Sequence, residues 1–277
     1  MAATVVRDSV GAASWTRATR PAAAELRGVL HRPHVGFVQQ AAAAQSWVEP
    51  PPPTVTLIVT LDGWLRTDGC ELPPAWVGAL TNRHAVVECG PVYGGLDLKL
   101  EPLGAYRVLG VPMGALEGAT VGLDDLLGAD GRRLVEALGA CDGWDARFDI
   151  LDRFLARRLR AGPRVSGEVA WAWARLRATE GLVPIAELAR EIGWSRRHLG
   201  VRFREQVGLP PKTVARLLRF ARVRRLIAAQ PVRWADIAYE CGYADQSHLN
   251  RDFRDLAGTT PTRFVASMLP APDYASA

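Results

Sequence analysis

The feature that most constrains the fold of this chain is a repeat in its last third. The segment LAREIGWS, which begins at Leu188, recurs in similar form as IAYECGYAD, which begins at Ile237. The copies are 49 residues apart up to their glycine and 50 residues apart beyond the turn. After the turn both copies carry the same four residue types with the same spacing: Leu199 and Leu249, Phe203 and Phe253, Gly208 and Gly258, Pro211 and Pro261. This duplication predicts two copies of one helical motif.

Each copy carries the local signals of a helix-turn-helix. Gly193 and Gly242 can take the left-handed conformation that ends a first helix. Ser195 and Asp245 are good N-caps for a second helix. The leucine and phenylalanine four residues apart would bury one face of that second helix. We therefore expect helix-turn-helix units at about residues 184–208 and 234–258.

The outward face of each second helix is rich in groups that can read DNA bases. Arginine can donate two hydrogen bonds to guanine, and asparagine or glutamine can form a bidentate pair with adenine. A solvated surface explains one such helix, but it explains two repeated helices with the same polar face less well. The candidate base-reading residues are Arg197 and Val201 in the first unit and Gln246, Ser247, Asn250 and Arg251 in the second.

A long helix is predicted at residues 212–229, between the two units. Its 18 residues would span about 27 Å, comparable to the ~34 Å between successive major grooves on one side of duplex DNA. Residues 1–160 have a net charge of −2 and residues 161–277 one of +7, so the basic excess lies with the repeat. The helix arginines could contact phosphates or pair with acidic neighbours: Arg216, Arg219, Arg222, Arg224 and Arg225.

Residues 190–211 and 234–261 resemble the tandem helix-turn-helix domain of the AraC/XylS family, and the stretch GYADQSHLNRDFRDLAGTTP is the most diagnostic. The resemblance covers roughly residues 169–267. It implies a bacterial transcription regulator whose seven-helix domain binds two consecutive major grooves. The family's base contacts fall on the six residues named above and on Gly200, which has no side chain to read with. Flanking positions assigned to phosphate contact or positioning are Ser195, Arg196, His198, Arg204, His248 and Arg254.

The N-terminal part has the pattern of short strands, at residues 55–61, 85–89, 96–100 and 106–111. An apolar stripe within residues 144–160 predicts an amphipathic helix, which would dock on the strands or form a dimer contact. By resemblance of architecture we expect a cupin-like barrel. The predicted α+β multidomain chain comprises a loosely ordered segment 1–25, a β-rich effector-sensing domain 26–120, a helical linker, dimerisation or docking segment 121–162, an all-α DNA-binding domain 163–270 and a tail 271–277.

Candidate ligand-binding residues are the aromatic side chains of the strand region: Trp47, Trp64, Trp76 and Tyr93. His31, His34 and His84 have no further ligand at metal-binding spacing, and the four cysteines form no CxxC pair. We therefore expect neither a metal nor another cofactor.

No catalytic motif is present, and no cysteine has the Pro-Cys-His setting of the alkyltransferases fused to some family members. The predicted function is therefore sequence-specific transcription regulation without enzymatic activity. The alternatives are an architectural DNA-binding protein and, with less support, an enzyme fused to a DNA-binding domain. Expected partners are double-stranded DNA, RNA polymerase, a small-molecule effector and a second copy. The chain lacks a secretory signal and a long apolar segment, which predicts a cytoplasmic, nucleoid-associated protein that does not contact membranes.

Overall fold

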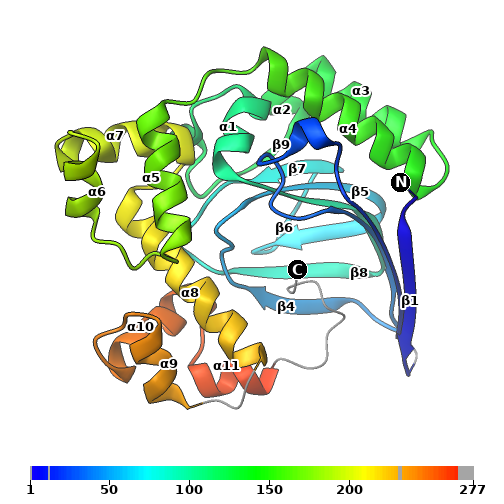
Figure 1. Cartoon of the computed structure of the whole chain (residues 1–277). Helices are drawn as coiled ribbons and strands as arrows, with labels where there is room; N and C mark the ends of the chain where they lie inside the picture. Colours follow the sequence, from blue (N-terminus) through cyan, green and yellow to red (C-terminus); the bar gives the residue numbers. More distant parts are fainter. Residues whose placement is uncertain (1, 12, 230–232, 268–277) are drawn as a thin grey trace.

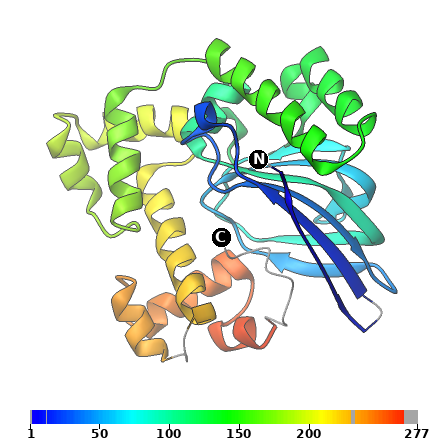
Figure 2. The same cartoon turned by 45° about the vertical axis from the view of Figure 1, so that its right-hand side comes forward.

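The computed structural model describes residues 2–11, 13–229 and 233–267, so the predicted tail at 271–277 lies outside it. An antiparallel sheet and its covering helices lie on one side of the molecule, and helices α5–α11 lie on the other (Figures 1 and 2). The strands are β1 (Thr4–Val10), β2 (Ala13–Arg20), β3 (His34–Gln40), β4 (Gln45–Glu49), β5 (Val55–Thr67), β6 (Cys70–Glu71), β7 (Ala75–Gly78), β8 (Ala85–Leu100) and β9 (Thr120–Gly122).

Two short 3₁₀ helices and eleven α-helices complete the described part of the chain. In chain order they are η1 (Ala24–Leu26), α1 (Pro102–Leu109), η2 (Met113–Leu116), α2 (Leu123–Leu127), α3 (Ala129–Gly139), α4 (Trp144–Ala161), α5 (Gly167–Ala178), α6 (Ile185–Glu191), α7 (Arg196–Val207), α8 (Pro211–Ala229), α9 (Trp234–Glu240), α10 (Gln246–Ala257) and α11 (Pro261–Ser267). The β-rich N-terminal domain and the seven-helix C-terminal domain predicted from the sequence are confirmed.

The sheet is built around β5 and β8, in the order β1-β2-β3-β8-β5-β7-β9, with β4 added to β8 and β6 to β5. The two strands predicted at 85–89 and 96–100 are one strand. Pro91 is tolerated within it because it lies between the residues paired with β4 and those paired with β3. Register shifts in the β5–β8 ladder at Thr60/Asp62 and Gly63/Leu65 mark irregularities that bend the sheet.

Two N-terminal predictions are wrong. The segment 1–25, expected to be loose, contains β1 and β2, which pair over seven residues from Thr4↔Thr19 to Val10↔Ala13. The strand expected at 106–111 is replaced by α1, which has a proline in its first turn and ends at Gly110 with φ 74°. Its apolar side chains are buried at helical spacing, and this packing overrides the β preference of the local sequence.

The helix predicted at 144–160 is α4, and its stripe is docked inside the molecule. Phe148, Leu151 and Leu155 are fully buried, where α4 packs on α1, α3, η1 and β2. Docking, the first of the two roles predicted for this helix, is therefore the observed one. No helix in the described residues is long and apolar enough to cross a bilayer.

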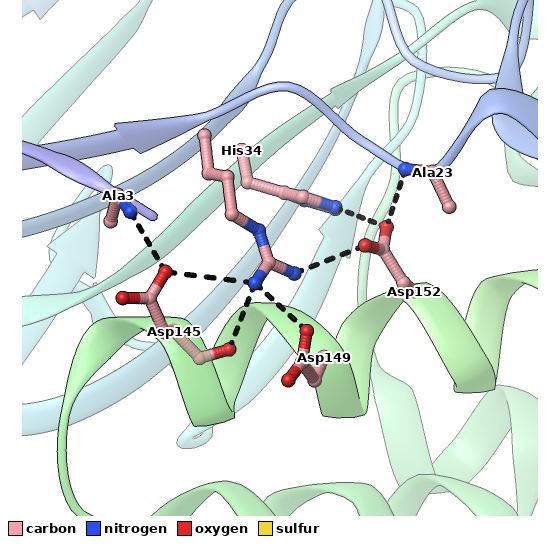
Figure 3. A network of polar contacts seen from close by, with 7 residues as sticks. Ala3, Ala23, His34, Asp145, Asp149 and Asp152 are labelled. Atoms are coloured by element: carbon pink, nitrogen blue, oxygen red, sulfur yellow. Dashed lines mark hydrogen bonds and ion pairs between the residues drawn. The ribbon is translucent and has the colours of Figure 1, made fainter. Parts of the chain in front are cut away.

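A polar network fastens α4 to the sheet (Figure 3). Buried Arg20, at the end of β2, pairs with Asp149 at 2.8 Å and with Asp152 at 3.1 Å. The fully buried His34 of β3 contacts Asp152 through Nε2 at 2.7 Å and stacks on Phe148. Burial lowers the pKa of His34, although Asp152 acts in the opposite direction.

One continuous hydrophobic core joins the two halves. It includes Leu57 and Leu98 of the sheet as well as Leu199 and Phe253 of the C-terminal helices. The C-terminal helices are therefore held against the sheet domain by packing and are not tethered to it by the chain alone.

Candidate nucleic-acid interface

Both repeats fold as helix, turn and helix at the predicted places. Gly193 and Gly242 end α6 and α9 with φ of 72° and 71°, which a residue with a Cβ rarely adopts. Ser195 and Asp245 then cap α7 and α10. The Ser195 hydroxyl accepts a hydrogen bond from the His198 amide at 3.1 Å, and the Asp245 carboxylate accepts one from the His248 amide at 2.7 Å.

In the second helix of each unit, the leucine and phenylalanine predicted to face inward are buried. Leu199 and Phe203 of α7 are fully buried, and so are Leu249 and Phe253 of α10. The Phe253 ring lies edge-on to Phe220 of α8 at 4.9 Å between centroids. Because these side chains fix the rotation of each helix about its axis, the opposite face points outward.

The two histidines at matching repeat positions have the same surroundings. His198 lies edge-on to Trp194 at 4.5 Å between ring centroids, and His248 lies edge-on to Tyr243 at 5.1 Å. Each aromatic ring is in the turn before the helix. Both histidines therefore pack against the turn, while staying at the edge of the outward face.

The residues expected to read bases lie on the outward faces of α7 and α10. These helices lie towards opposite ends of α8, away from the sheet (Figure 1). Val201 is 61% exposed, so its side chain is accessible to a partner. Exposed side chains are Arg197, Gln246, Ser247 and Arg251, and Asn250 is half-buried.

The arginines of α8 have contacts within the protein. Arg216 pairs with Asp252 at 2.7 Å and with Asp255 at 2.6 Å. Burial would lower the pKa of Arg216, but the hydrogen bonds and attraction of the two carboxylates outweigh it and the pKa is raised. Arg222 and Arg225 pair with Glu180, Arg219 donates to the Gly181 carbonyl at 3.1 Å, and burial lowers the pKa of Arg224. Acidic pairing, one of the two predicted roles, therefore occupies Arg216, Arg222 and Arg225.

The positions assigned to phosphate contact divide into two groups. Ser195, Arg196, His198 and Arg254 are exposed and His248 is half-buried. Arg204, although exposed, forms an ion pair with Glu117 of the N-terminal half at 2.7 Å. Glu117 could not be identified from the sequence, because no local pattern indicates that this acidic residue contacts α7.

The four aromatic residues proposed to bind a ligand do not converge on one place. Tyr93 belongs to a small cluster with Phe37 and Cys89, and Trp76 packs against it. Trp47 is partly exposed on β4, and its indole N–H donates to Glu49 at 3.1 Å. The guanidinium carbon of Arg66 lies over the Trp64 ring, 4.6 Å from the ring centroid. Trp76 and Tyr93 are therefore associated with the same small cluster.

Comparison with known proteins finds matches to the C-terminal part. Residues 188–267 match the family described as "Helix-turn-helix domain". The chain is 34% identical over 67 residues to an uncharacterized HTH-type transcriptional regulator, YbfI, of Bacillus subtilis, and 32% identical over 72 residues to the F1 operon positive regulatory protein of Yersinia pestis. Each match covers 24% of the relative, and 24% and 26% of this chain, so the chain aligns with about a quarter of these relatives.

Among solved structures, ToxT from Vibrio cholerae aligns with 83% of this chain and 96% of its own length, at 11% identity and a TM-score of 0.47. The repeat geometry and the family match agree on the same residues. Residues 188–267 form a helix-turn-helix domain of the AraC type.

Proposed function

We propose that this protein is a sequence-specific DNA-binding transcription regulator that inserts α7 and α10 into consecutive major grooves. The observation that carries the proposal is the pair of capped helices with exposed polar faces at repeat-equivalent positions, joined by α8. At 19 residues, α8 is about 28 Å long, near the ~34 Å between adjacent grooves. The names of the two curated relatives, both regulators, support the same function.

The sheet domain, residues 26–120 together with β1 and β2, is assigned to sensing a small molecule or to dimerisation. Residues 121–162 connect it to the DNA-binding domain, which begins near residue 163. RNA polymerase and a second copy of the chain are proposed partners, and the nucleoid is the proposed location.

Burial argues against a catalytic role for two of the four cysteines. Cys89 and Cys241 are buried, and burial raises the pKa of both thiols, that of Cys241 to about 11. A protonated, enclosed thiol is a poor nucleophile for alkyl transfer. The protein is therefore proposed to act by binding and not by catalysis.

Footprinting on genomic fragments tests the function. A regulator should protect discrete sites of about two helical turns per protomer, whereas uniform protection would identify an architectural protein. At a discrete site, Arg251→Ala should cost about 1–3 kcal/mol of binding free energy and relax one base position. Arg254→Ala is the matched control on the same helix, because loss of a phosphate contact weakens binding equally on cognate and random DNA. Equal losses for Arg251→Ala on both DNAs would contradict its base-reading role.

A further inference from the structure

The N-terminal domain contacts both helix-turn-helix units at the same repeat position. This surface, here called the interdomain clamp, consists of Leu80 and His84 from the loop between β7 and β8, and Met113, Gly114 and Glu117 in and directly after η2. The clamp meets α7 and α10 at their C-terminal ends, where the repeat places Gly208 and Gly258.

The clamp packs closely against the first unit. A Cβ at Gly114 would lie 2.9 Å from the Arg204 carbonyl oxygen, so the η2 backbone is seated directly on the last turn of α7. A Cβ added at Gly208 would lie 3.5 Å from the Cβ of Met113 and 3.8 Å from the Cβ of Leu80. The side chains of Met113 and Leu80 are both buried. Glu117 Oε2 closes the contact by accepting from Arg204 Nε at 2.8 Å and Nη2 at 2.7 Å.

The clamp contacts the second unit through the side chain of His84. The His84 ring lies over Gly258, where a Cβ would be 2.7 Å from Nε2, and its Nδ1 is 3.3 Å from the Asp255 carbonyl oxygen. Arg254, the repeat equivalent of Arg204, is exposed, and no carboxylate pairs with it in the described part of the chain. The clamp therefore pairs Arg204 of the first unit with a carboxylate. Among the described residues, it leaves Arg254 of the second unit without one.

We propose that Glu117 competes with a DNA phosphate for Arg204, so that the clamp restrains the first helix-turn-helix unit until this ion pair opens. The inference rests on the proposed function and adds an intramolecular regulator to it. A carboxylate that holds a phosphate-binding guanidinium must be displaced before the guanidinium reaches the backbone, which lowers the affinity for any duplex. The clamp also fixes how the two units are oriented, because a single surface of the sheet domain contacts both.

Binding titrations of the full chain test the competition, with Glu117→Gln compared to the wild type on cognate and random duplexes. The variant keeps the side chain's shape and removes its charge. We expect about two- to fivefold tighter binding on both duplexes, the range of an exposed ion pair. The gain should disappear in the Arg204→Ala background.

Glu205→Gln is the matched control. Glu205 lies on α7 itself, pairs with Arg202 at 2.6 Å and is as exposed as Glu117, 34% against 36%. A general effect of removing a negative charge near DNA would appear in both variants. Equal gains from both, unchanged affinity in Glu117→Gln, or a gain that persists without Arg204 would overturn the inference.

Hydrogen exchange measured without DNA gives an independent readout. In Glu117→Gln the amides of η2 and of residues 203–208 should exchange faster than in the wild type, while those of α10 change less; unchanged exchange would count against the restraint. The random duplex separates this inference from the proposed function, because phosphates are present in any sequence. Absence of discrete footprints would reject sequence-specific regulation and leave the competition for Arg204 measurable.

Discussion

Single residues decide where α7 and α10 begin and how these helices are rotated. Ser195 and Asp245 cap α7 and α10 through the amides of His198 and His248, as expected from their residue types alone. Glu117 and Asp252 also hold α7 and α10 in place, but they contact arginines 87 and 36 residues away. Local patterns reveal a cap because its partner is three residues distant, and they cannot reveal an ion pair across the molecule.

His34 should make the stability of the protein depend on pH. Its pKa is lowered in the folded state because burial disfavours the charged ring, while the unfolded chain has the ordinary value near 6.5. The unfolded state therefore binds the proton first, and stability should fall as the pH decreases below about 6.5. In His34→Gln the denaturant midpoint should change less between pH 7 and pH 5 than in the wild type. His198→Gln, in which an exposed histidine is lost, should keep the wild-type slope; the same slope in His34→Gln would contradict this role.

At the scale of elements, the helix-turn-helix units were predictable and the α1 region was not. In α6–α7 and α9–α10 the periodicity, the caps and the glycines all favour the same structure. In α1 the aromatic and β-branched residues favour a strand, and burial between α4 and α7 selects a helix. Local preference decides an element only when tertiary packing agrees with it.

Gly200 within α7 and Gly208 directly after it should respond to substitution by alanine with changes in stability of opposite sign. Gly200 is in the helix, has a negative φ, and a Cβ there would meet no atom within 4 Å. Gly200→Ala should therefore raise the free energy of unfolding by about 0.5–1 kcal/mol. Gly208 has a φ of 111° and faces Met113, so Gly208→Ala should lower it by about 1 kcal/mol or more. Chemical denaturation of both variants measures the difference, and a shift of the same sign in both would refute the argument.

At the scale of the whole molecule, a buried carboxylate ties the C-terminal helices to the sheet. Glu101, with 6% of its side chain exposed, contacts Arg177 of α5 at 2.9 Å and His31 at 2.8 Å. Arg177→Gln should lower the free energy of unfolding by about 1 kcal/mol, because half of the arginine side chain is solvated and screens the interaction. Arg175→Gln on the same helix, which removes an exposed arginine, should change it by less than about 0.5 kcal/mol. Equal effects of the two variants in denaturant titrations would show that the pair does not join the domains.

The amino-acid sequence alone determined the tandem helix-turn-helix domain, its capped helices α7 and α10 and their outward faces. These features depend on contacts within a few turns of chain and on a repeat that can be read directly from the sequence. Tertiary structure alone decided that β1 and β2 extend the sheet, that α1 is a helix and that the clamp meets both units at their terminal glycines. These outcomes depend on which apolar surfaces, far apart in the sequence, are buried against each other. Local sequence patterns carry no information about that pairing.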